Sequence, residues 1–338
     1  MKKVLLTLCS LCMGMVLLQS CCKGDEGNPP VNPGGTWESR NMTIENATYQ
    51  EGAFPTTTDG SSISGLSINP RALPGGMNII TIVTKKKYKK FYVGLKDDSA
   101  GYLVYTPEET STGDYYTYTI PVMYSPTYGK NEMTMLISAE DEDGNITEPY
   151  EAEISFVDSE SGELNINLTF SNAKDIDLHL IMPSGEQIYY GARGGSVQTT
   201  DGKVITYGLD HDSNAGCSID NLNNENIYIP AELIQSGTYR VIVNMYSNCD
   251  ANISTSWSVV TRYKGQLIST TAGKNPATGV YAVGAERGDF TTAMEFTIND
   301  AGTRAGANIK AGSFIPTPQN DMDIMKMEEE KFFMEINK

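Results

Sequence analysis

The residues best suited to chemistry lie in one short stretch, Asp175 to Leu180, which alternates polar and apolar side chains without a break. Successive side chains of a β-strand point to opposite faces, so Asp175, Asp177 and His179 share one face and three aliphatic residues share the other. Neighbouring carboxylates on one face repel each other, and His179 is one of only two histidines in the chain. Such a face needs a positive neighbour or an open, hydrated rim, and we interpret it as part of a binding site.

Further acidic residues are candidates for the same site. If the strands pair as their alternation indicates, the side chains near positions 210 and 225 meet Asp175 and Asp177 at one end of a β-sandwich. Ca²⁺ takes about six to eight oxygen ligands, and carboxylates suit it. Asp210-x-Asp212-x-Asn214 has the first half of a calcium-loop spacing, although no glutamate stands at its twelfth position. The predicted ligands of a bound Ca²⁺ are Asp175, Asp177, Asp210, Asp212 and Glu225.

Two other interpretations of these residues stay open. In one, the carboxylates form a polar network in which aspartate side chains cap turns. In the other, His179 and His211 hold a transition metal such as zinc together with aspartates. In the calcium interpretation His179 is a poor ligand and instead hydrogen-bonds a carboxylate.

The N-terminus predicts export and lipid anchoring. A basic start precedes an apolar run from Val4 to Leu18, which is too short to span a bilayer core that takes roughly 20 residues. The sequence Leu18-Gln19-Ser20-Cys21 resembles the lipobox of bacterial lipoproteins. That resemblance implies a signal peptide over residues 1–20 and acylation of Cys21, which would attach the chain to a membrane. A simple secretion signal cleaved elsewhere is the alternative.

Residues 21–35 are rich in Gly, Pro and polar side chains and predict a flexible tether. The acidic pair Asp25 and Glu26 resembles the export signal of lipoproteins that reach the outer face of some Gram-negative outer membranes. We therefore expect an outer-membrane protein exposed at the cell surface, and a periplasm-facing location stays open.

Composition narrows the class of the folded part. The net charge of -17 and pI near 4.5 argue against nucleic-acid binding, which needs a basic surface. Many Tyr, Thr and Asn residues in short alternating runs predict an all-β fold. We expect two tandem β-sandwich domains at 36–159 and 160–299, followed by a flexible tail at 300–338 with a short helix as an alternative. The turn Ser138 to Asn145 resembles the closing hairpin of bacterial Ig-like modules, which implies an Ig-like first domain.

Of the six cysteines, only Cys217 and Cys249 fall in the expected folded part. A lone pair in an oxidising compartment predicts one disulfide. Two unpaired buried thiols are the alternative.

The second expected domain carries an ordered series of motifs: Asp-x-Asp-Leu-His, Pro-x-Gly, Tyr-Tyr, Leu-Asp-x-Asp, Glu-Asn-Ile and Gly-x-Tyr-x-Val-x-Val-x-x-Tyr. This series is similar to the YfaP-like domain, an uncharacterised family of secreted and lipoprotein-borne bacterial β-sandwiches. The resemblance implies an exported β domain without an assigned reaction. This chain departs from it by a long loop at 194–206 and by its two cysteines. The matching positions are Asp175, Asp177, His179, Pro183, Gly185, Tyr189, Tyr190, Leu209, Asp210, Asp212, Glu225, Asn226, Gly237, Tyr239 and Tyr246.

The sequence lacks the Gly-x-Ser-x-Gly, His-Glu-x-x-His and phosphate-binding glycine motifs, so we expect a protein that is not an enzyme. The favoured function is a surface lipoprotein for adhesion or ligand binding, stabilised by calcium. Its exposed aromatic residues Tyr189, Tyr190 and Tyr207 would contact a glycan or protein. The alternatives are a structural envelope component and a hydrolase that uses the acidic cluster.

Overall fold

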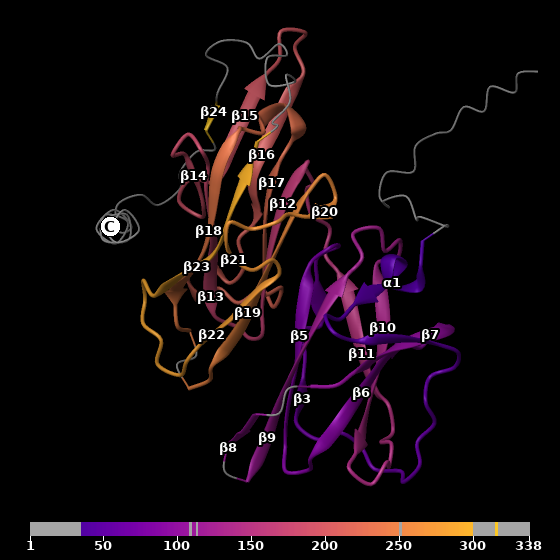
Figure 1. Ribbon diagram of the computed structural model, residues 1–338. Coiled ribbons are helices and arrows are strands. Elements are labelled where there is room, and N and C mark those ends of the chain that lie inside the picture. The colour runs from indigo at the N-terminus through magenta and orange to yellow at the C-terminus, as the bar shows by residue number, and fades with distance from the viewer. Residues whose placement is uncertain (1–34, 108–109, 113, 250–251, 300–314, 317–338) are drawn as a thin grey trace, which may run out of the picture.

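The computed structural model describes residues 35–299, apart from 108–109, 113 and 250–251, and also residues 315–316. The signal peptide, Cys21, almost all of the tether and most of the tail lie outside the described residues. The described chain is nearly all β-structure, which confirms the predicted fold class (Figure 1). None of its helices is both long and apolar enough to cross a membrane.

The first sandwich comprises two mainly antiparallel sheets that follow a short helix, α1 (Trp37–Arg40). One sheet has the strand order β1-β9-β5-β3, with β8 also paired to β9. The other has the order β2-β7-β6-β10-β11-β4, in which β4 pairs parallel to β11. The strand bounds are β1 (Met42–Thr43), β2 (Thr48–Glu51), β3 (Leu66–Ser67), β4 (Arg71–Ala72), β5 (Met77–Thr84), β6 (Tyr88–Leu95), β7 (Asp98–Tyr105), β8 (Thr110–Thr112), β9 (Tyr115–Tyr124), β10 (Glu132–Asp141) and β11 (Tyr150–Phe156).

Alternation explains why these segments form strands. In β5, Ile80 and Ile82 are fully buried in the core between the sheets, whereas Val83 is exposed. β-Branched and aromatic residues pack well on such a pleated, half-buried surface. Residues from both sheets therefore share one hydrophobic core.

The second sandwich has its own core between two further sheets. The larger sheet has the order β20-β19-β12-β17-β16-β15-β24, with β22 also paired to β19, and the smaller has the order β14-β13-β18-β23-β21. Two 3₁₀ turns interrupt the connections, η1 (Ala215–Cys217) and η2 (Ala231–Leu233). The strand bounds are β12 (Leu164–Phe170), β13 (Asp175–Ile181), β14 (Gln187–Ile188), β15 (Gly194–Gln198), β16 (Val204–His211), β17 (Asn224–Ile229), β18 (Gly237–Ser247), β19 (Thr255–Tyr263), β20 (Gln266–Leu267), β21 (Ala272–Gly273), β22 (Ala277–Tyr281), β23 (Phe290–Ile298) and β24 (Ile315–Pro316).

The predicted disulfide is confirmed: Cys217 in η1 is bonded to Cys249 just after β18, with 5.6 Å between their Cα atoms. On the chain-entropy model, closing a loop of this length stabilises the fold by roughly 3–4 kcal/mol.

The two sandwiches touch through β5, which lies against β12 and β19 (Figure 1). The Ser258 hydroxyl donates to the Met77 carbonyl at 3.0 Å, and Arg262 Nε donates to the Gly75 carbonyl at 3.1 Å. The Asn69 amide of the first sandwich also donates to the Leu222 carbonyl of the second at 3.0 Å. These polar contacts join backbone groups to side chains across the junction.

Candidate metal centre

The stretch that carries the chemistry forms strand β13, and both of its faces are buried. Ile176 and Leu178 are fully buried in the core of the second sandwich, as the alternation predicts. Asp175, Asp177 and His179 are only 1–2% exposed, so no open, hydrated rim solvates them. Burying carboxylates without a partner for their charge is expensive, and the neighbouring groups must account for it.

Three carboxylates converge at the start of β13. Oxygen atoms of Asp177, Asp212 and Glu225 all lie within 4.8 Å of one another. Glu225 lies on β17 opposite Leu168, whose side chain is in the core, so the register points Glu225 into the interior. Its Oε2 accepts a hydrogen bond from the backbone N–H of Leu178 at 2.6 Å. Strands from both sheets therefore contribute to one acidic cluster.

Asp175 extends this cluster toward the loop of residues 212–223. Its Oδ2 accepts a hydrogen bond from the Gly216 N–H at 2.6 Å, and the neighbouring Cys217 N–H, which donates to the Asn214 carbonyl at 2.8 Å, also favours the ionised carboxylate. Asp212, at the start of the loop, lies 3.7 Å from a guanidinium nitrogen of Arg193. We use the name acidic cluster for Asp175, Asp177, Asp212 and Glu225 together.

Burial governs the electrostatics of the acidic cluster. Burial raises the pKa of Asp175 to about 7, against the opposing Gly216 hydrogen bond and with added repulsion from Asp212. Burial, followed by repulsion from neighbouring carboxylates, holds the pKa of Asp177 and of Glu225 well above the usual range. Burial also raises the pKa of Asp212, although the Arg193 charge opposes it. The protein alone thus disfavours the ionised state of all four groups.

Each member of the acidic cluster also has one buried oxygen that lacks a hydrogen-bond donor. These atoms are Asp175 Oδ1, Asp177 Oδ2, Asp212 Oδ1 and Glu225 Oε1. A buried acceptor left unsatisfied costs about 1–3 kcal/mol, and more when it is charged. A hard divalent cation would satisfy all four oxygens and offset their repulsion.

Asp210, predicted as a ligand, does not join the acidic cluster. Its Oδ1 accepts from the Asn226 amide and its Oδ2 from the Glu160 N–H, each at 2.6 Å. Leu209 packs into the core, so the next side chain points to the opposite face of β16, and a bulge follows before His211. This placement corrects the predicted ligand set: both oxygens of Asp210 are satisfied elsewhere.

The histidines do not support the transition-metal interpretation. Among the described residues, the group whose ligand atoms could share a metal contains no histidine. His179 Nδ1 lies 2.7 Å from the Gln187 amide nitrogen rather than against a carboxylate, and its ring stacks on Tyr189 with 5.0 Å between centroids. Burial lowers the pKa of His179 to about 3, which keeps the ring neutral. His211 Nε2 lies 2.6 Å from the Asp158 carbonyl.

The expectation that three tyrosines present exposed rings was wrong for two of them. Tyr189 and Tyr207 are only 5% and 6% exposed. Tyr207 belongs to the core and donates its hydroxyl to Glu186 at 2.8 Å. Tyr190 is partly buried and packs edge-on against Tyr246. These rings complete the packing of the sandwich.

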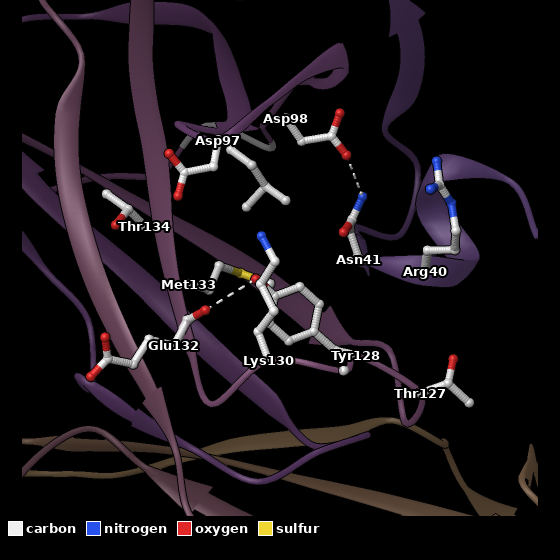
Figure 2. Close-up of a pocket in the computed structure, with 12 residues that line it drawn as sticks. Arg40, Asn41, Asp97, Asp98, Thr127, Tyr128, Lys130, Glu132, Met133 and Thr134 are labelled. Atoms are coloured by element: carbon white, nitrogen blue, oxygen red, sulfur yellow. Dashed lines mark hydrogen bonds between the residues drawn. The ribbon is translucent and has the colours of Figure 1, made fainter. Parts of the chain in front are cut away.

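A separate cavity of about 520 Å³ lies in the first sandwich, between the end of α1 and the β9–β10 loop (Figure 2). Figure 2 shows Lys130 reaching into it between Asp97 and Asn41. The Asn41 amide donates to Asp98 at 3.2 Å. Acidic and basic side chains both line this cavity, whereas the acidic cluster consists of carboxylates alone.

Sequence reasoning missed the groups that surround the carboxylates. The polar–apolar alternation of the strands does not identify the neighbours of the acidic cluster, which include the Gly216 and Cys217 amides and the Arg193 guanidinium. Arg287, whose charge opposes the raised pKa of Asp175 and of Asp177, is equally distant in sequence. The density of Asn and Gly in residues 213–223 was the available signal, because such residues tolerate the left-handed backbone of a tight loop.

Comparison with known proteins leaves the family open. No family model matches this sequence, and no curated protein matches it. Among solved structures, the chain is similar to the C-terminal domain of the AgI/II polypeptide BspA of Streptococcus agalactiae, at 8% sequence identity and a TM-score of 0.18. The match covers 74% of this chain and all of that one.

Proposed function

We propose that this chain is a lipid-anchored protein of the cell envelope whose second sandwich binds Ca²⁺ at the acidic cluster. One observation carries the proposal: four nearly buried carboxylates converge, each with an oxygen that no protein donor satisfies. The donor set consists of carboxylate oxygens, which favours Ca²⁺ over metals that prefer nitrogen or sulfur ligands.

The ion's role is structural. Glu225 and Asp177 are 0% and 2% exposed, so a substrate has no access to them, and this burial argues against a hydrolase built on the acidic cluster. A bound ion would join β13, β17 and the loop 212–223, and would thereby stiffen one end of the sandwich. We propose that this stiffened module is displayed for adhesion or for binding a glycan or protein, with a purely structural envelope role as the second candidate.

The direct test is elemental analysis of the mature chain, purified in detergent, together with thermal melts in Ca²⁺ and in chelator. We expect one Ca²⁺ per chain and a higher melting temperature with Ca²⁺, because an ion that binds only the folded state stabilises it by mass action. The absence of both effects would refute the calcium site.

Two variants form a matched pair for this test. Asp212→Asn removes a member of the acidic cluster and should abolish the calcium-dependent rise in melting temperature. Asp210→Asn makes the same chemical change two residues earlier, on the opposite face, and should keep it. Equal losses in both variants would indicate a general charge effect in place of a site.

For the envelope assignment, surface proteolysis of intact cells distinguishes an outward-facing chain from a periplasmic one. Glycan-array binding that disappears in chelator would support ligand display.

A further inference from the structure

The loop 212–223 lies between the acidic cluster and the Cys217–Cys249 disulfide. We propose that this disulfide positions the calcium site, by holding the loop so that its amides and Asp212 stay in place against β13. The inference rests on the proposed function, and it adds the residues that maintain the site.

The disulfide is close to the acidic cluster along the chain, because Cys217 directly follows the residue that donates to Asp175. The Gly216 N–H donates to the carboxylate of Asp175, and the next amide, that of Cys217, donates to the Asn214 carbonyl within the loop. Asp175 pairs across the sheet with Ser247, two residues before Cys249. The Ser247 hydroxyl lies 3.2 Å from Cys217 Sγ. The cross-link therefore ties the loop to the same two strands, β13 and β18, that fix the position of Asp175.

The loop needs such a constraint because its backbone is unusual. Left-handed φ angles are uncommon outside glycine, and this short segment holds five residues with positive φ. They are Asn214 (61°), Gly216 (57°), Cys217 (63°), Asn221 (61°) and Asn223 (52°). A chain released at Cys217 would gain access to other conformations, and the Gly216 amide would leave Asp175.

Side-chain hydrogen bonds hold the two ends of the loop, whereas its middle carries the short-range backbone bonds of η1, from the Cys217 N–H to the Asn214 carbonyl at 2.8 Å and from the Ser218 N–H to the Ala215 carbonyl at 3.1 Å. Asn214 donates to the Lys174 carbonyl at 2.9 Å and accepts from the Asp220 N–H at 3.1 Å. Near the other end, the Leu222 carbonyl accepts from Asn69 of the first sandwich. Gly216 is exposed, and the backbone bonds of η1 join it only to neighbouring residues of the same loop, so the disulfide is the covalent link from this segment to the end of β18.

The hydrophobic core of the second sandwich does not include this cross-link. Cys217 and Cys249 are both partly exposed and lie outside the hydrophobic core of the second sandwich. β13 pairs with β18 from Asp175 to Ile181, and Lys174 Nζ contacts the Asn248 side chain, so these two strands have bonds to each other besides the disulfide. Loss of the disulfide should therefore loosen the loop while the sandwich stays folded.

The test compares Ca²⁺ affinity in the full mature chain, in detergent, with and without the cross-link. The double variant Cys217→Ala/Cys249→Ala avoids free thiols. Isothermal titration with Ca²⁺, at a temperature where circular dichroism shows both proteins folded, should give a Kd at least tenfold weaker for the variant. Hydrogen exchange should show faster exchange at the Gly216 amide, while the amides of the β18–β23 ladder keep their protection.

The outcomes separate the two proposals. If the wild-type chain binds no Ca²⁺, the proposed function fails. If the wild-type chain binds Ca²⁺ and the double variant binds it with the same Kd, the calcium site stands and the positioning role is overturned.

If the double variant does not fold, the same measurement is made on wild-type protein treated with dithiothreitol. Dithiothreitol reduces the Cys217–Cys249 disulfide to two thiols, and its own two thiols are oxidised to a cyclic disulfide. Weaker Ca²⁺ binding by the folded, reduced protein supports the positioning role. Global unfolding on reduction would overturn it, because the disulfide would then hold the whole fold.

Discussion

The buried acidic cluster predicts an unusual dependence of stability on pH. In chelator, we expect the free energy of unfolding to fall as pH rises from about 4 to about 8. The sign follows from the raised pKa values of the cluster: the folded chain binds protons more tightly than the unfolded chain over this range. The stabilisation is complete below the unfolded pKa, near 4, and is lost as pH rises through the folded pKa values.

Asp175 sets the scale of this effect. Its pKa rises from 3.8 to about 7, roughly three units, and each unit corresponds to about 1.36 kcal/mol, so this group alone accounts for about 4 kcal/mol. At roughly 2–4 °C per kcal/mol, the melting temperature in chelator should drop by about 10 °C across the range. Ca²⁺ at about 100 times its Kd restores about 2.7 kcal/mol at the high-pH end.

Differential scanning calorimetry over this pH range, in chelator and in Ca²⁺, measures both curves. The double variant Asp177→Asn/Glu225→Gln removes two buried titratable groups with little change of shape, so its curve in chelator should be flatter and its response to Ca²⁺ absent. Asp210→Asn should keep the wild-type slope. Stability in chelator that stays level or increases between about pH 5 and pH 8 would refute the reasoning.

Three further predictions concern the fold and its anchor. Leu168→Ala empties a fully buried position and should cost about 2–5 kcal/mol in urea unfolding, and a cost below about 1 kcal/mol would contradict its core position. Arg262→Ala removes the bond to Gly75 and should lower the free energy of unfolding by about 1–3 kcal/mol, with calorimetry showing the sandwiches melting separately; one unchanged transition would argue against coupling here. Cys21→Ser should release the chain from the membrane fraction, and retention there would contradict lipid anchoring.

The polar–apolar alternation of residues 175–180 predicted the β-strand and its core-facing side chains correctly, because a strand's period of two is a local property. The same alternation could not tell that Asp175 and Asp177 are buried. Their burial depends on β17 and on the loop 212–223, which cover the start of β13 from distant parts of the sequence. The spacing Asp210-x-Asp212 likewise gave no reason to separate the two carboxylates. In the tertiary structure Asp210 accepts a hydrogen bond from Asn226, and Asp212 joins the acidic cluster.

What the sequence determined by itself is the all-β fold, the faces of its strands and the pairing of its two remaining cysteines. These follow from side-chain period and from cysteine count, and neither needs knowledge of distant contacts. Tertiary structure decided which polar groups and which tyrosines are buried, and which carboxylate oxygens lack a hydrogen-bond donor. Those properties depend on the solvent and neighbours of each atom, and they exist only after remote segments of the chain have packed together.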